Sequence, residues 1–113
     1  MSKRDPALLI VDILMAIRKI QVYTTGLDYN SFLADSRTVD AVERNFEIIG
    51  EAASQLPKAF QEANAQITWH SVISFRNRLI HGYFGVDYQI MWYIIEHDLQ
   101  PLKEQFEQLR SMS

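Results

Sequence analysis

The sequence predicts an all-α fold, an antiparallel bundle of four to five helices built from a single domain, residues 1–113. In four long segments, apolar residues recur every three or four positions, which is the period of a helix that buries one face. No segment alternates polar and apolar residues as a half-buried strand does. The connections between the segments are short, so consecutive helices should run antiparallel.

Local signals place the first helix at residues 6–24. Asp5 can cap this helix, and Pro6 suits the first helical position, where its missing N–H is not needed. Gly26 follows, a residue that can end a helix in a left-handed conformation. The apolar residues at helical spacing, which should form the buried face, are Leu9, Ile10, Ile13, Leu14, Ile17 and Ile20.

Two shorter segments should flank the second long helix. Residues 27–34 are expected to form a loop with one helical turn, capped by Asp28. Phe32 and Leu33 should both turn inward from this segment. Residues 58–63 should form another short turn after the second long helix ends.

The second long helix should begin at Ser36 and end at Pro57. Its apolar positions alternate by three and four, as in the seam of a bundle helix. They are Val39, Val42, Phe46, Ile49, Ala53 and Leu56. Gly50 inside a helix is less favourable than Ala by about 1 kcal/mol, so we expect another helix to cross closely at this position.

The third helix should start at Thr68 as its N-cap, with Ile67 as a hydrophobic staple, and should end near Gly82. Residues 85–87, Gly-Val-Asp, then supply a turn and the N-cap of the next helix. The buried stripe of the third helix would consist of Val72, Ile73, Leu79 and Ile80.

The fourth helix should follow this turn and continue toward the C-terminus. A kink is expected in it, because Pro101 cannot donate a hydrogen bond to the carbonyl of His97. Its apolar positions are Met91, Ile94, Ile95, Leu99, Leu102, Phe106 and Leu109.

Composition narrows the possible functions. The chain has no cysteine, which excludes disulfides, thiolate zinc sites and cysteine nucleophiles and fits the reducing cytoplasm. No apolar run approaches the roughly 20 residues of a membrane span, and the N-terminus lacks a signal-peptide pattern, so we expect a cytoplasmic protein. A formal net charge of −3 argues against nucleic-acid binding by a broadly basic surface. Any contact with RNA should therefore be local.

Five polar residues lie within eight positions of the predicted third helix: Arg76, Asn77, Arg78, His81 and Tyr83. On a helix, Asn77 and His81 share one face, and Arg76 and Tyr83 share the neighbouring face. An arginine that stays charged can neutralise phosphate oxygens, while a histidine that titrates near neutral pH can move a proton. This combination suits chemistry on a phosphate group.

Three of these residues also have a structural interpretation. Arg76 could form an ion pair with a carboxylate such as Glu51 or Asp87. His81 could interact with the dipole at a helix C-terminus. Asn77 could cap or bridge backbone groups. The residues alone leave these alternatives open.

Other chemically capable residues favour structural roles. Trp69 and Trp92 should be core or interface anchors, because nothing around them resembles a base-stacking platform. The cluster at 96–98, Glu-His-Asp, lacks metal-ligand spacing, since consecutive helical residues point in different directions. A helical stripe of three carboxylates should be solvated or should dock a basic partner. This stripe consists of Glu43, Glu47 and Glu51.

Two stretches carry a resemblance to a known family. Residues 76–83 read Arg-Asn-x-x-x-His-x-Tyr and are followed by Gly-Val-Asp and a new helix. This pattern resembles the signature of the HepT-type toxins, which are ribonucleases of the HEPN superfamily. Residues 41–53, AVERNFEIIGEAA, look like the central helix of the same family. Together with Trp69 and the helix after the motif, the resemblance covers nearly the whole chain.

The resemblance implies a helical bundle and a metal-independent endoribonuclease that uses no cofactor. In such sites the ribose 2′-hydroxyl attacks the adjacent phosphate. His81 would move the proton, Arg76 would stabilise the phosphoryl charge, and Asn77 would support them. Arg78 would contribute to binding the RNA substrate.

The resemblance also implies partners. The family forms homodimers in which two motif helices line one cleft, so that a second Arg76 and His81 complete the site. The protein would be the toxin of a type VII-like toxin–antitoxin pair. Its antitoxin would be an MntA-type minimal nucleotidyltransferase that transfers AMP to the motif tyrosine, Tyr83. The alternative is a non-catalytic helical module that binds a nucleotide or phosphate and presents it to a nucleotidyltransferase.

Overall fold

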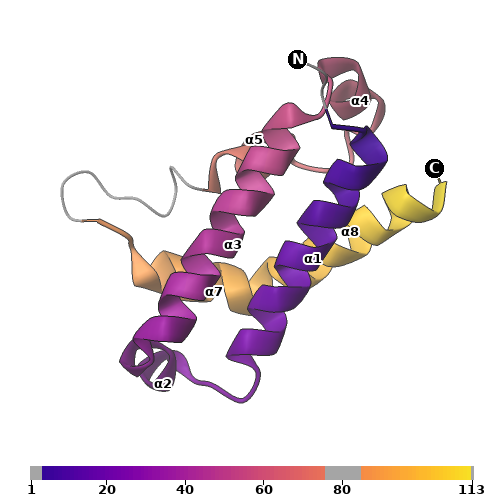
Figure 1. The fold of residues 1–113 in the computed structure, drawn as a ribbon. Coiled ribbons are helices and arrows are strands. Elements are labelled where there is room, and N and C mark those ends of the chain that lie inside the picture. Colours follow the sequence, from indigo (N-terminus) through magenta and orange to yellow (C-terminus); the bar gives the residue numbers. More distant parts are fainter. Residues whose placement is uncertain (1–3, 76–84, 113) are drawn as a thin grey trace.

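The computed structural model describes residues 4–75 and 85–112. The elements in these two ranges are helices, which confirms the all-α prediction (Figure 1). They are α1 Pro6–Thr24, α2 Tyr29–Ala34, α3 Ser36–Gln55, α4 Lys58–Ala63, α5 Trp69–Ile73, α7 Tyr88–His97 and α8 Leu99–Met112. Within the described ranges, none of these helices combines the length and the apolar composition that crossing a bilayer requires.

The long helices α1 and α3 run antiparallel and pack along each other (Figure 1). Helix α8 packs against α1, and α5 packs against α3 near the C-terminal end of that helix. Side chains from all of these helices meet in one core. The largest side chains with less than 2% of their surface exposed are Phe32, Phe46, Phe106, Leu9, Ile13, Ile17, Ile20, Ile49, Ile67, Met91, Ile94 and Leu99.

Short polar side chains cap the N-termini of α1 and α2 at the predicted positions. The Asp5 carboxylate accepts a hydrogen bond from the backbone N–H of Ala7 at 2.8 Å, and Pro6 occupies the first helical position. Asp28 caps α2 through a reciprocal pair of hydrogen bonds with Ser31. Gly26 has a φ of 79°, which confirms the predicted left-handed stop after α1.

Two predictions about the short segments are wrong in part. Phe32 is fully buried as expected, but Leu33 is 39% exposed. Helix α2 is a short helix that packs against α3, and Phe32 is its one buried residue. Thr68 stands at the N-cap position of α5, but its side chain makes no capping hydrogen bond.

The predicted third helix is interrupted. Helix α5 ends at Ile73, and Ser74 takes φ −87° and ψ 8°, well away from helical ψ. The backbone N–H of Ser74 donates to the carbonyl of His70 at 3.0 Å and closes a turn there. The expected continuation through 76–82 lies outside the described residues.

The predicted kink in the fourth helix appears as a break. Helix α7 ends at His97, Asp98 is its C-cap, and α8 begins at Leu99. Pro101 therefore lies in the first turn of α8. A backbone N–H in that turn would have no acceptor within the helix, so the proline removes no helical hydrogen bond. The break lets Met91 and Ile94 of α7 and the apolar face of α8 reach the same core.

Both tryptophans are anchors, as predicted. The indole N–H of Trp69 donates to the carbonyl of Asn64 at 3.0 Å. The ring of Trp69 packs edge-on against Phe106, with the ring centres 5.7 Å apart. Trp92 joins α7 to α2, because its ring lies 5.1 Å from that of Phe32.

Candidate functional site

The motif residues Arg76, Asn77, Arg78, His81 and Tyr83 all fall within residues 76–84 and lie outside the described residues. Their roles remain predictions. The structure does describe the chain on both sides of the motif, up to residue 75 and again from residue 85. These flanks show what holds the ends of the motif segment.

Aromatic packing anchors the N-terminal flank. Phe75, the residue directly before the motif, is 3% exposed. Its ring lies perpendicular to that of Phe46 on α3, with the ring centres 5.6 Å apart. This edge-to-face arrangement is a favoured geometry for aromatic pairs. The chain therefore enters the motif from a fixed point on α3.

A close helix crossing lies beside this anchor. A Cβ atom added to Gly50 would stand 3.1 Å from the backbone carbonyl oxygen of Ile73 on α5. The predicted crossing at Gly50 is thus confirmed, and α5 is its partner. Glycine lets the backbones of α3 and α5 approach more closely than any other residue would allow. The crossing sets α5, and with it the start of the motif, against α3.

The C-terminal flank also returns to α3. Gly85 has a φ of 83°, and the Asp87 carboxylate accepts a hydrogen bond from the backbone N–H of Ile90 at 3.1 Å, capping α7 as predicted. Tyr88, the first residue of α7, is partly buried. Burial raises the pKa of its phenol above the ordinary value, and the neighbouring carboxylate of Glu43 on α3 raises the pKa further. Helix α3 therefore holds the chain at both ends of the motif.

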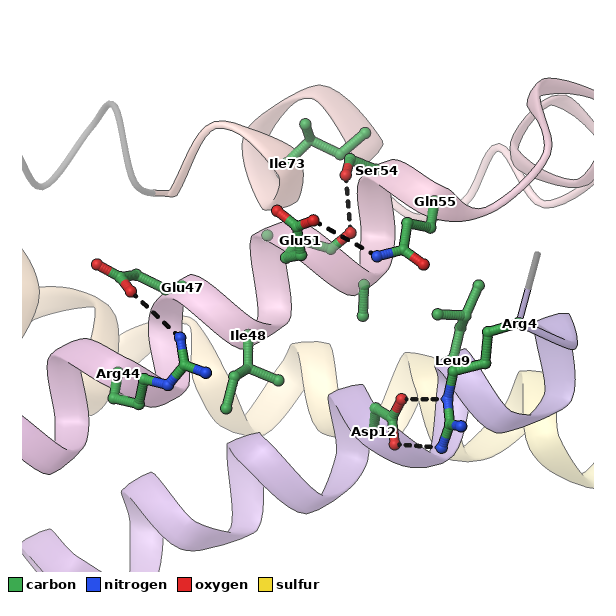
Figure 2. Close-up of a pocket in the computed structure, with 12 residues that line it drawn as sticks. Arg4, Leu9, Asp12, Arg44, Glu47, Ile48, Glu51, Ser54, Gln55 and Ile73 are labelled. Carbon is green, nitrogen blue, oxygen red and sulfur yellow. Dashed lines mark hydrogen bonds and ion pairs between the residues drawn. The ribbon is translucent and has the colours of Figure 1, made fainter. Parts of the chain in front are cut away.

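A groove with a volume of about 430 Å³ lies beside the N-terminal flank (Figure 2). Its walls come from the N-terminal part of the chain with α1, from α3 and from Ile73 of α5. The residues that line it are Arg4, Leu9, Asp12, Arg44, Glu47, Ile48, Gly50, Glu51, Ala52, Ser54, Gln55 and Ile73.

Two ion pairs lie in the groove, one on its α1 side and one on α3 (Figure 2). On the α1 side, Arg4 makes two hydrogen bonds to Asp12, at 2.7 and 3.1 Å. On α3, Arg44 Nη1 lies 3.6 Å from a carboxylate oxygen of Glu47, a long contact between two exposed side chains. Arg44 is not among the functional residues predicted from sequence. Its spacing to the apolar residues of α3 was visible, but which face would meet a groove was not.

The predicted carboxylate stripe divides between two environments. Glu43 lies near Tyr88 and affects the pKa of its phenol, whereas Glu47 and Glu51 line the groove. Glu51 accepts a long hydrogen bond of 3.5 Å from Gln55. The stripe is therefore neither uniformly solvated nor a continuous acidic surface.

The Glu-His-Asp cluster at 96–98 shows no convergence of ligands. The ring of His97 stacks instead on Tyr93, with the ring centres 4.4 Å apart. Over the described ranges 4–75 and 85–112, no three His, Asp or Glu side chains gather as a metal ion would require.

The family model and the most similar relatives that we compared indicate the same family. The profile of the family described as "Ribonuclease HepT-like" matches residues 13–109. A Thermococcus cleftensis protein named "Probable ribonuclease HepT" is 40% identical over 99 residues, covering 88% of this chain and 90% of its own. A Methanocaldococcus jannaschii protein, also assigned by name as an RNase, is 37% identical over 107 residues, covering 95% of this chain and 98% of its own. No solved structure gives a significant match.

One relative carries the same unit inside a larger protein. A second Methanocaldococcus jannaschii protein is 36% identical over 103 residues, covering 91% of this chain but 46% of its own. Its name combines a gamma-glutamylcyclotransferase with an RNase. The family match begins within α1, includes the motif and ends within α8, at residue 109. The chain therefore belongs to the HepT-like ribonuclease family.

Proposed function

We propose that this protein is a metal-independent endoribonuclease. The observation that supports the proposal most is the Arg-Asn-x-x-x-His-x-Tyr motif at 76–83, in a chain matched to HepT-like ribonucleases from residue 13 to residue 109. The contacts of Phe75 and Tyr88 with α3 add support. They restrict where the motif segment begins and ends, and restricted reactive groups reach the correct geometry for reaction more often. Relatives named as RNases share this unit over most of their length.

The proposed reaction is an in-line displacement at an RNA phosphate. His81 takes the proton from the ribose 2′-hydroxyl, whose oxygen attacks the adjacent phosphorus while the bond to the 5′-oxygen breaks. Arg76 neutralises the charge that builds up on the non-bridging oxygens. The products are a 2′,3′-cyclic phosphate and a free 5′-hydroxyl, which takes up a proton. Asn77 supports the two catalytic groups, and Arg78 binds the RNA backbone.

The proposed biological unit is a homodimer, because the reaction needs both a base and an acid and each motif supplies one histidine. The second His81 serves as the acid. In this proposal the protein is the toxin of a toxin–antitoxin pair, and its antitoxin is a minimal nucleotidyltransferase that transfers AMP to Tyr83.

A nuclease assay tests the proposal directly. Protein purified free of any partner should cleave single-stranded RNA and leave 2′,3′-cyclic phosphate ends, which mass spectrometry of the fragments identifies. The same RNA with a deoxyribose 5′ of the cleaved bond should resist, because the attacking hydroxyl is missing there. RNA that is bound but left intact would favour the non-catalytic nucleotide-binding module instead.

A further inference from the structure

A second groove, which we call the α1–α8 groove, lies between these two helices and has a volume of about 410 Å³. The two helices pack against each other (Figure 1). Near the C-terminal end of α1, the side-chain amide of Gln21 donates a hydrogen bond to the amide oxygen of Gln100 at 2.9 Å and joins the two walls. The described residues that line this groove are Val11, Leu14, Met15, Arg18, Gln21, Val22, Thr25, Lys103, Glu107 and Arg110. None of them belongs to α3, α5 or α7, so this groove is separate from the one beside the motif.

The α1 wall exposes a stripe of apolar side chains. Leu8, Met15 and Val22 are spaced by seven residues, which places them on one side of the helix. Leu8 is 46% exposed, Met15 is 52% exposed and Val22 is 59% exposed. Val11 and Leu14, which are partly buried, lie beside them. The stripe runs for about 21 Å along α1, and a row of exposed apolar side chains is typical of a surface on which another protein packs.

Basic side chains border the apolar stripe. Arg18 and Arg110 are exposed, and Lys103 is partly exposed. Glu107 is the one carboxylate among the described residues that line the groove. The whole chain has a formal net charge of −3, so this groove is basic in a protein that is acidic overall. An occupant that complements the groove therefore carries carboxylates beside an apolar surface.

The form of the groove fits a helix better than an extended peptide. Residues that are seven apart repeat after two helical turns, so a helix laid along α1 can place its own apolar side chains between Leu8, Met15 and Val22. Amphipathic helices bind in such grooves through anchors spaced by three and four residues. An extended peptide usually adds a strand to the edge of a sheet, whereas the elements in the described residues are helices.

Other occupants fit the α1–α8 groove less well. RNA would meet the cations, but the α1 wall is mainly apolar, and none of the described lining residues is an aromatic on which a base could stack. A two-fold contact with a second copy of this chain would place the same cations opposite each other, which is repulsive. A flat bilayer surface does not follow a groove between two helices. An acidic amphipathic helix matches both the apolar stripe and the charges.

We propose that the α1–α8 groove binds an acidic amphipathic helix of a partner protein. The apolar face of that helix packs on Met15 and Val22, and the carboxylates beside that face pair with Arg18 and Lys103. The inference follows from the exposure and the charges of the groove. It does not depend on the proposed ribonuclease, and it can be tested without RNA.

Fluorescence anisotropy with two designed peptides tests the groove in the whole protein. The acidic probe is a labelled helical peptide of about 18 residues, with Leu at positions spaced by three and four and Glu on both sides of that stripe. The basic probe is the same peptide with Lys in place of each Glu. The protein should bind the acidic probe about tenfold or more tightly than the basic probe, because only the acidic probe complements Arg18 and Lys103.

Substitutions in the groove identify the contact surface. Met15→Asp should weaken binding of the acidic probe by about tenfold or more, because it places a charge within the apolar stripe. The double variant Arg18→Glu/Lys103→Glu should reverse the preference and bind the basic probe more tightly. Tyr93→Asp on α7 and Arg37→Glu on α3 are matched controls, because both residues are exposed and lie outside the groove. Circular dichroism should show unchanged helix content throughout.

Three results with the probes would overturn the proposed site: no binding of the acidic probe, equal binding of both probes, or unchanged binding by Met15→Asp. If Met15→Asp dissociates an oligomer of the protein in sedimentation, the groove is a contact between copies instead. If Arg18→Glu/Lys103→Glu loses affinity for RNA while its preference between the probes is unchanged, the groove is an RNA site. The ribonuclease proposal is judged separately, because RNA cleavage is not part of any probe measurement.

Discussion

The carbonyl oxygen of Ile73 lies 3.1 Å from the position that a Cβ on Gly50 would occupy. This approach presses α5 against α3 directly before the motif. A helix interior ordinarily disfavours glycine by about 1 kcal/mol relative to Ala. Gly50 lies at a crossing where a larger side chain would push the two helices apart.

We expect Gly50→Ala to destabilise the fold. The helix-propensity gain of about 1 kcal/mol is outweighed by overpacking against a backbone atom, which typically costs about 1–3 kcal/mol. Urea denaturation should show a net loss of up to about 2 kcal/mol, and cleavage should fall because α5 is displaced. Ser54→Ala, at an exposed position on the same helix, should be neutral or slightly stabilising. A more stable Gly50→Ala protein would mean that the crossing can relax without penalty.

Arg76→Ala and His81→Ala should each abolish RNA cleavage and leave helix content and dimerisation unchanged. Both groups act in the same transition state, so combining the substitutions should add little to either one alone. Rates measured on one defined RNA, together with sedimentation of each variant, provide the check. Wild-type cleavage by either variant would remove that residue from the mechanism.

Cleavage should persist in EDTA. In the proposed reaction, His81 supplies the proton transfer and Arg76 the charge neutralisation that a metal ion would otherwise provide. Rates measured with and without the chelator should agree within experimental error. Complete loss in EDTA that magnesium or manganese restores would contradict the proposed site.

Tyr83 should receive AMP when the protein is made together with its cognate nucleotidyltransferase, and the modification should silence cleavage. A phosphate on that phenol would compete with the RNA backbone for Arg76 and Arg78. Peptide mass spectrometry of protein made with and without the partner locates the adduct. Tyr83→Phe should still cleave RNA but escape neutralisation. AMP on Tyr88, or full neutralisation of Tyr83→Phe, would place the switch elsewhere.

Tyr88 should make stability fall at alkaline pH. Burial and the neighbouring Glu43 raise the pKa of its phenol in the folded protein. A raised pKa means that the folded state favours the protonated phenol, so the stabilisation is complete below the unfolded pKa of about 10 and is lost as pH rises through the folded pKa. Chemical denaturation between about pH 8 and 11 should show a shallower decline for Tyr88→Phe than for wild type. Tyr93→Phe, on the exposed side of the same helix, should decline like wild type.

The sequence by itself determined the helix ends that depend on local contacts. Asp5 and Pro6 start α1, Gly26 follows its end, and Asp87 starts α7, all as predicted. Each of these signals acts within one helical turn, through a side chain that meets a nearby backbone group. Most of the apolar positions predicted from helical spacing in the described residues are buried, because burial of one face imposes that period. Leu14, Ile73 and Ile95 are only partly buried.

The motif at 76–83 was likewise identified from sequence, since its residues lie within eight positions and their chemistry can be recognised without a fold. The roles of Arg76, His81 and Tyr83 remain predictions, because they lie outside the described residues. The structure adds the contacts on both sides of the motif: Phe75 packs against Phe46, and after the motif Tyr88 lies near Glu43 of α3.

Only the tertiary structure decided which partners the helices meet. Sequence indicated a crossing at Gly50 but not that Ile73 would be the partner. It placed Leu33 inward, although the single core-facing side of α2 accepts Phe32 alone. It also gave no sign that Arg44 would line a groove. Such outcomes depend on how helices distant in sequence cross and compete for the same core, and no interaction within one turn encodes that geometry.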